Sequence, residues 1–158
     1  MTQALGSLPD STSTPSMNLL QHTKALQPQA SDWPGVSLAT SHDEHAQQRV
    51  LILDNTVDPT ILKDQLNDVD RIELHFPKFT DGRAYSQAVM LRRRCGFTGD
   101  IRATGDVLVD QIVQMKRTGF TSAVLRDDQN AQHAQKLLTQ FVGFYQGDAL
   151  ESPLFARH

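Results

Sequence analysis

At 158 residues, 39% of them hydrophobic, the chain is long enough for one globular domain with a proper core but hardly for two. Its formal net charge of −3 and its pI of about 6.0 argue against nucleic acid or an anionic membrane as a partner of the whole protein. The apolar runs are far shorter than the roughly 20 residues of a membrane-spanning helix and the N-terminus lacks a secretory signal, so we expect no membrane contact and a cytoplasmic location.

The first 48 residues contain four of the seven prolines and a single basic residue, Lys24, amid Ser, Thr, Gln and Asn. Such a composition buries too little apolar surface to offset the entropy lost on ordering. We therefore predict a mostly disordered tail over residues 1–48, with Trp33 as an anchor on the domain. His42 and His45 have no third ligand nearby, so we predict no metal site.

One α/β domain is expected over residues 49–146, followed by a C-terminal tail over residues 147–158. Short apolar runs bounded by turn residues predict its strands. These strands cover residues 50–53, 71–76, 99–103 and 122–125.

Acidic residues that suit helix N-caps precede the helices expected between and after these strands. In chain order the predicted caps are Asp58 before Pro59, Asp81, Asp106 and the pair Asp127–Asp128. Helical spacing then predicts the inward-facing side chains. For the second helix these are Ala84, Ala88, Leu91 and Cys95; for the third, Leu108, Ile112 and Met115; for the last, Ala131, Ala134, Leu138, Phe141 and Tyr145.

A weak internal repeat supports this alternation of strands and helices. The segment Arg93–Thr98 matches Lys116–Thr121, so that Gly96 and Gly119 occupy equivalent places after two helices. Repeated strand–helix units favour a parallel sheet with right-handed crossovers. The sequence thus predicts about four parallel strands, either open and doubly wound or part of a barrel, and a barrel fragment would favour a homodimer.

The loops after parallel strands meet at the C-terminal edge of a sheet, where ligands bind. We expect charges of both signs there, with helix N-termini that favour an anion. The candidate ligand-binding residues are Lys78, Arg83, Tyr85, Ser86, Arg102 and Gln111. The candidates for orienting a ligand or exchanging protons are Asp81, Asp106 and Asp110.

Simpler roles compete with this site. Helix capping accounts for Asp81 and Asp106 without any catalytic role. The three cationic candidates, Lys78, Arg83 and Arg102, could pair with neighbouring acids. The run Arg92–Arg94 suits a helix C-terminus better than a nucleic-acid surface. No dinucleotide fingerprint, Walker loop or nucleophile elbow occurs, so the sequence leaves any cofactor unknown.

A series of short motifs in order resembles the bacterial family called domain of unknown function 934. The motifs are Phe76–Gln87, Leu91–Arg92, Gly96–Gly99, Arg102–Ala103, Gly105–Leu108, Asp110–Gln111, Gly119–Phe120 and Tyr145–Gln146. The resemblance covers roughly residues 33–155. It implies a part in assimilatory sulfite reduction, because members are labelled probable oxidoreductases of that process, and it assigns no catalytic residue.

Two classes of function are therefore open. The first is an accessory protein of sulfite reduction that binds an anionic ligand at the C-terminal edge of the sheet, docks on sulfite reductase, or does both. The second is an oxidoreductase or other enzyme that acts on a small sulfur oxyanion or a nucleotide-like anion. The lack of a cofactor fingerprint favours the first class and the clustering of acids and bases favours the second; we prefer the accessory role.

Overall fold

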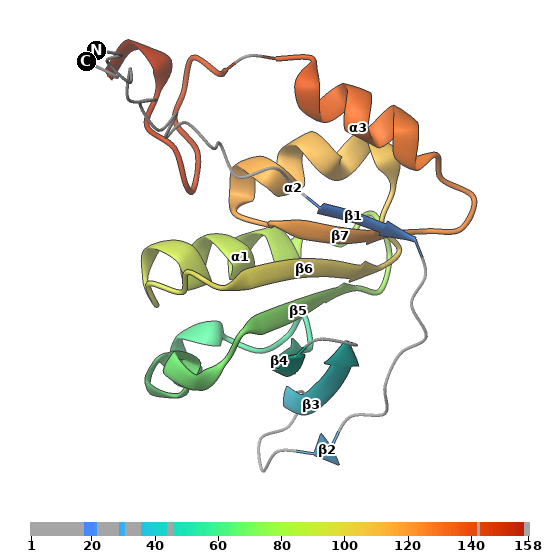
Figure 1. Ribbon diagram of the computed structural model, residues 1–158. Helices are drawn as coiled ribbons and strands as arrows, with labels where there is room; N and C mark the ends of the chain where they lie inside the picture. Colours follow the sequence, from blue (N-terminus) through green and yellow to red (C-terminus); the bar gives the residue numbers. More distant parts are fainter. Residues whose placement is uncertain (1–17, 22–28, 31–35, 44–45, 142, 157–158) are drawn as a thin grey trace, which may run out of the picture.

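A computed structural model describes residues 18–21, 29–30, 36–43, 46–141 and 143–156 of the chain (Figure 1). Its strands form one sheet in the order β1-β7-β6-β5-β4-β3-β2. The strands are β1 Asn18–Gln21, β2 Gln29–Ala30, β3 Val36–Asp43, β4 Ala46–Leu53, β5 Arg71–Phe76, β6 Asp100–Gly105 and β7 Ser122–Leu125. The helices are η1 Pro59–Asp68, α1 Arg83–Arg93, η2 Val109–Gln111, α2 Ile112–Thr118, α3 Ala131–Thr139 and η3 Leu154–Ala156, where η marks a 3-10 helix.

The predicted parallel sheet is confirmed. Strands β4, β5, β6 and β7 lie side by side in chain order, and each pairs in parallel with the next. The sequence predicted no strand before residue 50, yet β1 pairs in parallel with β7, while β3 and β2 extend the other end in antiparallel fashion. Strand β4 starts at Ala46 because its first residues pair with β3. Trp33 and His45 lie outside the described residues.

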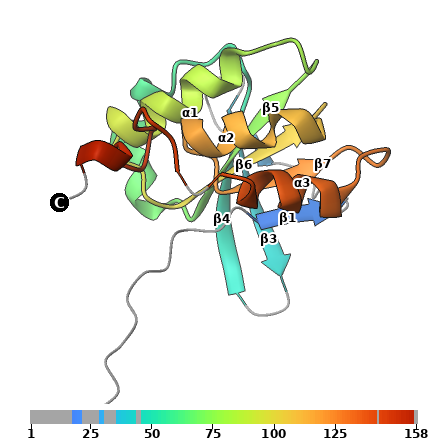
Figure 2. The ribbon, with the colours of Figure 1, turned by 90° about the horizontal axis from the view of Figure 1, so that it is seen from above.

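The helices of this sheet pack on one of its faces. Each of η1, α1 and α2 connects two neighbouring parallel strands, and right-handed crossovers between neighbours place their helices on the same side. In agreement, α1 contacts η1 and α2, and α2 contacts α3 (Figures 1 and 2). The arrangement differs from a doubly wound sheet, whose helices cover both faces.

A single apolar core fills the space between the helices and this face. Alternate strand residues such as Leu74, Ile101 and Ala123 point into it and are fully buried. The helices contribute apolar side chains at the predicted spacing, among them Leu91 and Met115. Because successive side chains of a strand point to opposite faces, the remaining strand residues line the second face of the sheet.

The internal repeat of the sequence corresponds to two equivalent helix ends. Gly96 and Gly119 both have positive φ angles, 68° and 109°, which glycine adopts without a Cβ clash. The phenylalanine after each glycine is buried and donates its N–H back to the preceding helix. Arg92 joins the two turns: its guanidinium donates to the carbonyl of Gly119 at 2.9 Å and to those of Phe97 and Gly99 at 2.8 Å.

The predicted last helix is too long. It ends at Thr139, and Phe141 and Tyr145 are 54% and 81% exposed instead of facing the core. Helical spacing continues past the point where the core surface stops, and spacing alone does not mark that point. The predicted cap Asp127–Asp128 is also wrong, because Asn130 caps this helix by accepting from the His133 N–H at 3.0 Å.

Candidate functional site

The C-terminal edge of the sheet is formed by charged loops that bind one another. After β5, the Asp81 carboxylate accepts two hydrogen bonds from the Arg83 guanidinium, at 2.7 and 3.0 Å. The same carboxylate accepts from the side-chain amide of Asn55, in the loop after β4, at 2.7 Å. Asp81 therefore ties two loops together. Gly82 holds the N-cap position of α1 without a side-chain bond, so the predicted cap is one residue off. The Asp81 carboxylate nevertheless accepts from the backbone N–H of Arg83, the first residue of α1, at 3.2 Å.

A second group of charges fastens the next two loops. The Asp106 carboxylate, after β6, accepts from Arg126 Nη1 at 2.7 Å and from the backbone N–H of Phe79 at 2.9 Å. Arg126, after β7, also forms a bidentate pair with Asp128, with both distances 2.6 Å. Asp106 does not cap a helix, because α-helix α2 starts only at Ile112, after the short η2.

These contacts set the charge state of the edge. Hydrogen bonds from Arg83 lower the pKa of Asp81 to about 2, and those from Arg126 lower the pKa of Asp128 to about 2. The N–H of Phe79 and the Arg126 guanidinium lower the pKa of Asp106 as well. All three carboxylates are ionised at neutral pH, which suits them to fixing loops more than to exchanging protons.

An exposed aromatic side chain stands on this edge with its backbone held on both sides. Phe79 donates its N–H to Asp106 and accepts a 2.7 Å bond at its carbonyl from Gln111 Nε2. Its side chain is nevertheless 47% exposed, and Lys78 beside it is exposed too. Asp110, on η2, is also exposed. The edge thus presents an exposed aromatic ring, on a backbone that is held in place, between charged groups.

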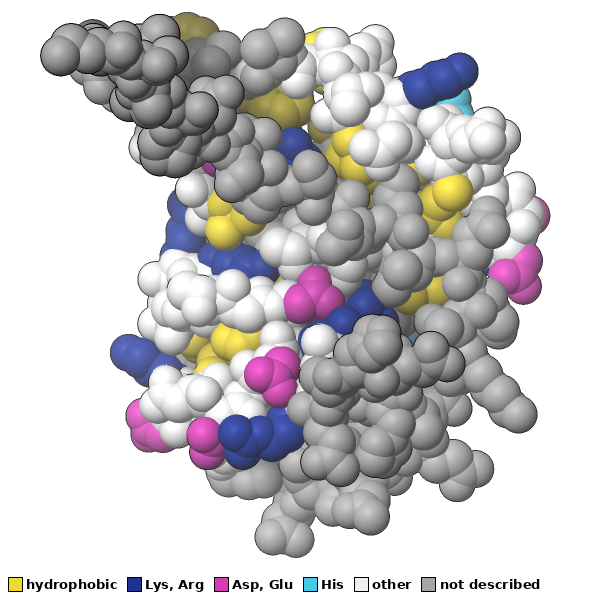
Figure 3. Space-filling model, viewed as in Figure 1, with side chains coloured by type: hydrophobic (Ala, Val, Ile, Leu, Met, Phe, Trp, Pro, Cys, Tyr) yellow, Lys and Arg dark blue, Asp and Glu magenta, His cyan; other side chains and the backbone are white. Residues whose placement is uncertain are grey.

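Arg102 lies away from the edge, in the middle of β6, on the face of the sheet opposite the core. There it opposes Glu73 of β5, and the pair Arg71 and Asp100 is opposed in the same register. We call these four residues the polar-face cluster. Figure 3 shows acidic and basic side chains next to one another on the face of the molecule that it displays. The prediction that Arg102 lies with Lys78 and Arg83 in one site is therefore wrong.

Asp100 is the centre of the polar-face cluster. Its carboxylate accepts from Arg71 Nε at 2.7 Å, from Thr121 Oγ1 at 2.5 Å and from Ser122 Oγ at 2.8 Å. Arg102 Nε donates to Ser122 Oγ at 3.3 Å, and the terminal guanidinium nitrogens lie 3.9 Å from Glu73 Oε1 and 3.8 Å from Asp100 Oδ2. Both arginine side chains are nearly buried, at 10% and 12% exposure.

The two carboxyls of this cluster titrate in opposite directions. Burial raises the pKa of Glu73, and the nearby arginines only partly offset that effect. Burial also acts to raise the pKa of Asp100, but its hydrogen bonds from Thr121, Ser122 and Arg71 outweigh burial and lower it. The cluster thus combines a fixed carboxylate with a carboxyl group that holds its proton to higher pH, next to two guanidinium groups.

Sequence reasoning named only Arg102 from this cluster. The signal for the others was present, because β5 and β6 alternate strictly between polar and apolar residues: Arg71-Ile-Glu-Leu-His-Phe76 and Asp100-Ile-Arg-Ala-Thr104. A strand of a parallel sheet covered on both faces is usually apolar throughout. The alternation therefore indicates a sheet with one apolar face and one polar face.

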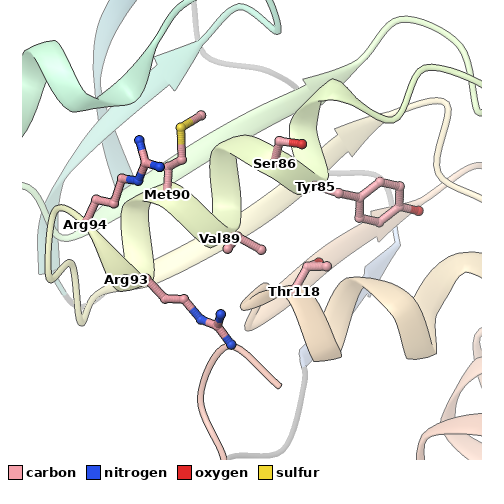
Figure 4. A pocket seen from close by; sticks show the side chains of 7 residues that line it. All are labelled: Tyr85, Ser86, Val89, Met90, Arg93, Arg94 and Thr118. Atoms are coloured by element: carbon pink, nitrogen blue, oxygen red, sulfur yellow. The ribbon is translucent and has the colours of Figure 1, made fainter. Parts of the chain in front are cut away.

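The remaining sequence candidates, Tyr85 and Ser86, belong to a third place, a groove of about 540 Å³ beside α1 (Figure 4). The residues that line it are Tyr85, Ser86, Val89, Met90, Arg93, Arg94 and Thr118. The Tyr85 ring packs edge-on against Phe76 and Phe120 at its base. Burial and the charge of Asp110 raise the pKa of the Tyr85 phenol, which keeps it protonated at neutral pH.

Among the described residues, no group of three or more His, Cys, Asp and Glu side chains is placed to hold a metal ion. None of the helices in the described part of the chain is long and apolar enough to cross a membrane. The fold and these surfaces define an α/β protein with a mainly parallel sheet that is apolar on its helix-bearing face and carries charged side chains of β5 and β6 on the other.

A family model described as "Bacterial protein of unknown function (DUF934)" matches residues 50–155, and the chain belongs to this family. No curated protein and no solved structure matches the chain.

Proposed function

We propose that this protein is an accessory of assimilatory sulfite reduction that docks on a protein partner, sulfite reductase, through the C-terminal edge of its sheet. The metabolic context is what the family resemblance implies. The docking mode is supported by the construction of the edge itself.

One observation carries the docking mode: Phe79 is exposed although its backbone is fixed on both sides. Exposed aromatic rings that lose little conformational freedom on binding are typical anchors of protein interfaces. A small anion is a poorer fit at this edge, because both of its guanidinium groups already form bidentate pairs with carboxylates of their own loops. An anion would have to displace Asp81 or Asp128 before it could bind in the same way.

The test is Phe79→Ala in a bacterial strain that needs this gene to grow on sulfate as its sole sulfur source. We expect loss of growth and at least about ten-fold weaker binding to purified sulfite reductase in sedimentation experiments, because truncating an anchor residue costs about 2 kcal/mol or more and about 1.4 kcal/mol is ten-fold in Kd. Ile61→Ala is the matched control, since Ile61 is 49% exposed, against 47% for Phe79, and lies on η1. Wild-type growth and binding of Phe79→Ala would rule out this docking surface.

The polar-face cluster favours the second candidate, an enzyme that acts on a small sulfur oxyanion. A guanidinium group such as that of Arg102 suits an oxyanion, although Arg71 is already bonded to Asp100 at 2.7 Å, and a carboxyl with a raised pKa, Glu73, suits proton donation. Calorimetric titration with sulfite separates the two candidates. Sulfite binding that is lost in Glu73→Gln or Arg102→Lys, with the fold intact, would favour the enzyme; heat only from sulfite reductase would favour the accessory.

A further inference from the structure

We propose that the groove beside α1 binds an acidic amphipathic helix of a partner protein. The groove lies on the outer side of α1, away from the polar-face cluster, and it is not part of the C-terminal edge. The proposal stands apart from the docking on sulfite reductase, and neither requires the other.

The charge of the groove is of one sign. Its charged lining residues are Arg93 and Arg94, and no carboxylate is among the described residues that line it; Asp58, an acid whose charge interacts with that of Arg94, lies outside the lining. This is unusual in a chain of net charge −3, whose arginines Arg71, Arg83 and Arg126 each lie against carboxylates. The groove therefore offers favourable electrostatics to an acidic partner.

The positions of the two arginines on α1 restrict the shape of the partner as well as its charge. Consecutive residues of a helix point about 100° apart, and Figure 4 shows the Arg93 and Arg94 side chains leaving α1 on different sides, with Val89 between them. Met90 extends the apolar surface on the side of Arg94. An occupant that meets both arginines must carry acids on two flanks and an apolar stripe in the middle. An amphipathic helix with acidic flanks has that arrangement.

Hydroxyl groups complete the lining. Ser86, on the side of Met90, and Thr118, at the end of α2, supply polar contacts at the rim, and the half-buried Tyr85 lies between α1 and α2 (Figure 4). A groove of this volume, open along an 11-residue helix, matches a peptide of a few helical turns. A small anion would reach only one of the two guanidinium groups. A nucleic acid, with regularly spaced phosphates, would leave the apolar floor unused and meet only two cations.

The probe is a fluorescein-labelled peptide of about 14 residues with leucine at helical spacing and glutamate elsewhere, followed by anisotropy with the full-length protein. We expect saturable binding that weakens as salt is added, because the rim contacts are ionic. Arg93→Glu/Arg94→Glu should raise the Kd at least about ten-fold. Lys63→Glu/Lys136→Glu changes the net charge equally at exposed sites outside the groove and should leave the Kd within about two-fold.

A second variant separates binding from folding. Arg93 donates to the Asp148 carbonyl at 3.0 Å, so its replacement also removes a contact with the C-terminal segment. Met90→Glu leaves that contact in place and puts a negative charge on the groove floor, and it should weaken the peptide to a similar extent, with an unchanged thermal midpoint.

Three results would overturn the proposal. The first is equal binding of a scrambled peptide with the same composition, which would show that the groove does not recognise the apolar stripe. The second is an unchanged Kd in both Met90→Glu and Arg93→Glu/Arg94→Glu. The third is tighter binding, in the same groove, of oligothymidylate or pyrophosphate, which would assign it to a nucleic acid or a small anion.

Discussion

The hydrogen bonds of Asp100 make the polar-face cluster the part of the surface whose loss should cost most stability. Asp100→Ala removes three bonds of 2.5–2.8 Å and leaves Arg71, with a side chain only 10% exposed, without its carboxylate. Breaking one side of a buried ion pair costs several kcal/mol because the remaining charge stays desolvated. Since Asp100 is 26% exposed, we take the lower end of that range, about 3 kcal/mol.

The chain provides a matched control with the same residue types. Arg49 and Asp68 form a 3.3 Å ion pair in which both side chains are more than half exposed. Asp68→Ala should therefore cost at most about 1 kcal/mol. Urea unfolding followed by far-UV circular dichroism measures both values. For a chain of this length, the 3 kcal/mol loss also corresponds to a fall of roughly 6–12 °C in the Tm.

The pH dependence and a double variant sharpen the test. The pKa of Asp100 is lowered in the folded state, so its contribution is present above about pH 4 and disappears as the pH falls through the lowered pKa. The cost of Asp100→Ala should thus shrink in acid. Arg71→Met/Asp100→Ala should recover part of the loss by removing the unpaired charge. A cost for Asp100→Ala no larger than that of Asp68→Ala would refute the reasoning.

Three further changes have distinct expected results. Burial raises the pKa of Glu73, so its ionisation costs stability as the pH rises from the unfolded-state value of about 4 through the raised pKa. Glu73→Gln should therefore gain Tm relative to wild type as the pH rises above about 4 in paired thermal melts. Gly105→Ala places a Cβ 2.3 Å from the Phe76 carbonyl oxygen at φ +90°, so it should lower the free energy of unfolding in urea by more than 3 kcal/mol. Gly96→Ala meets no atom within 4 Å and should cost only about 1 kcal/mol, so equal costs would contradict the clash at Gly105. Cys95 packs against the core, and burial raises the pKa of its thiol. An aromatic disulfide reagent should therefore label Cys95 at least about ten-fold more slowly in the native protein than in the urea-unfolded protein, and equal rates would place the thiol at the surface.

The sequence by itself determined the elements that depend on local pattern. Apolar runs and turn residues located the four strands β4 to β7, although not β1, which also pairs in parallel. Asp58 and Pro59 marked the start of η1 correctly, since the Asp58 carboxylate accepts from the Thr60 N–H at 2.9 Å. The inward face of α1 followed from helical spacing, because one stripe of a helix must meet the core. The repeated glycines predicted two equivalent helix ends, because each requires a positive φ.

The tertiary structure alone decided which charged side chains meet. In the sequence, Asp81, Asp106 and Asp128 are equally suitable as helix caps. In the structure, each carboxylate accepts a hydrogen bond from an arginine, an asparagine amide or a backbone N–H of a neighbouring loop or of its own loop. Arg102 was assigned to the edge although its strand continues to Gly105, and the register with β5 sets it against Glu73 instead. Ion pairs across strands depend on register and on which face a residue occupies, and both are fixed by pairing between segments far apart in the chain.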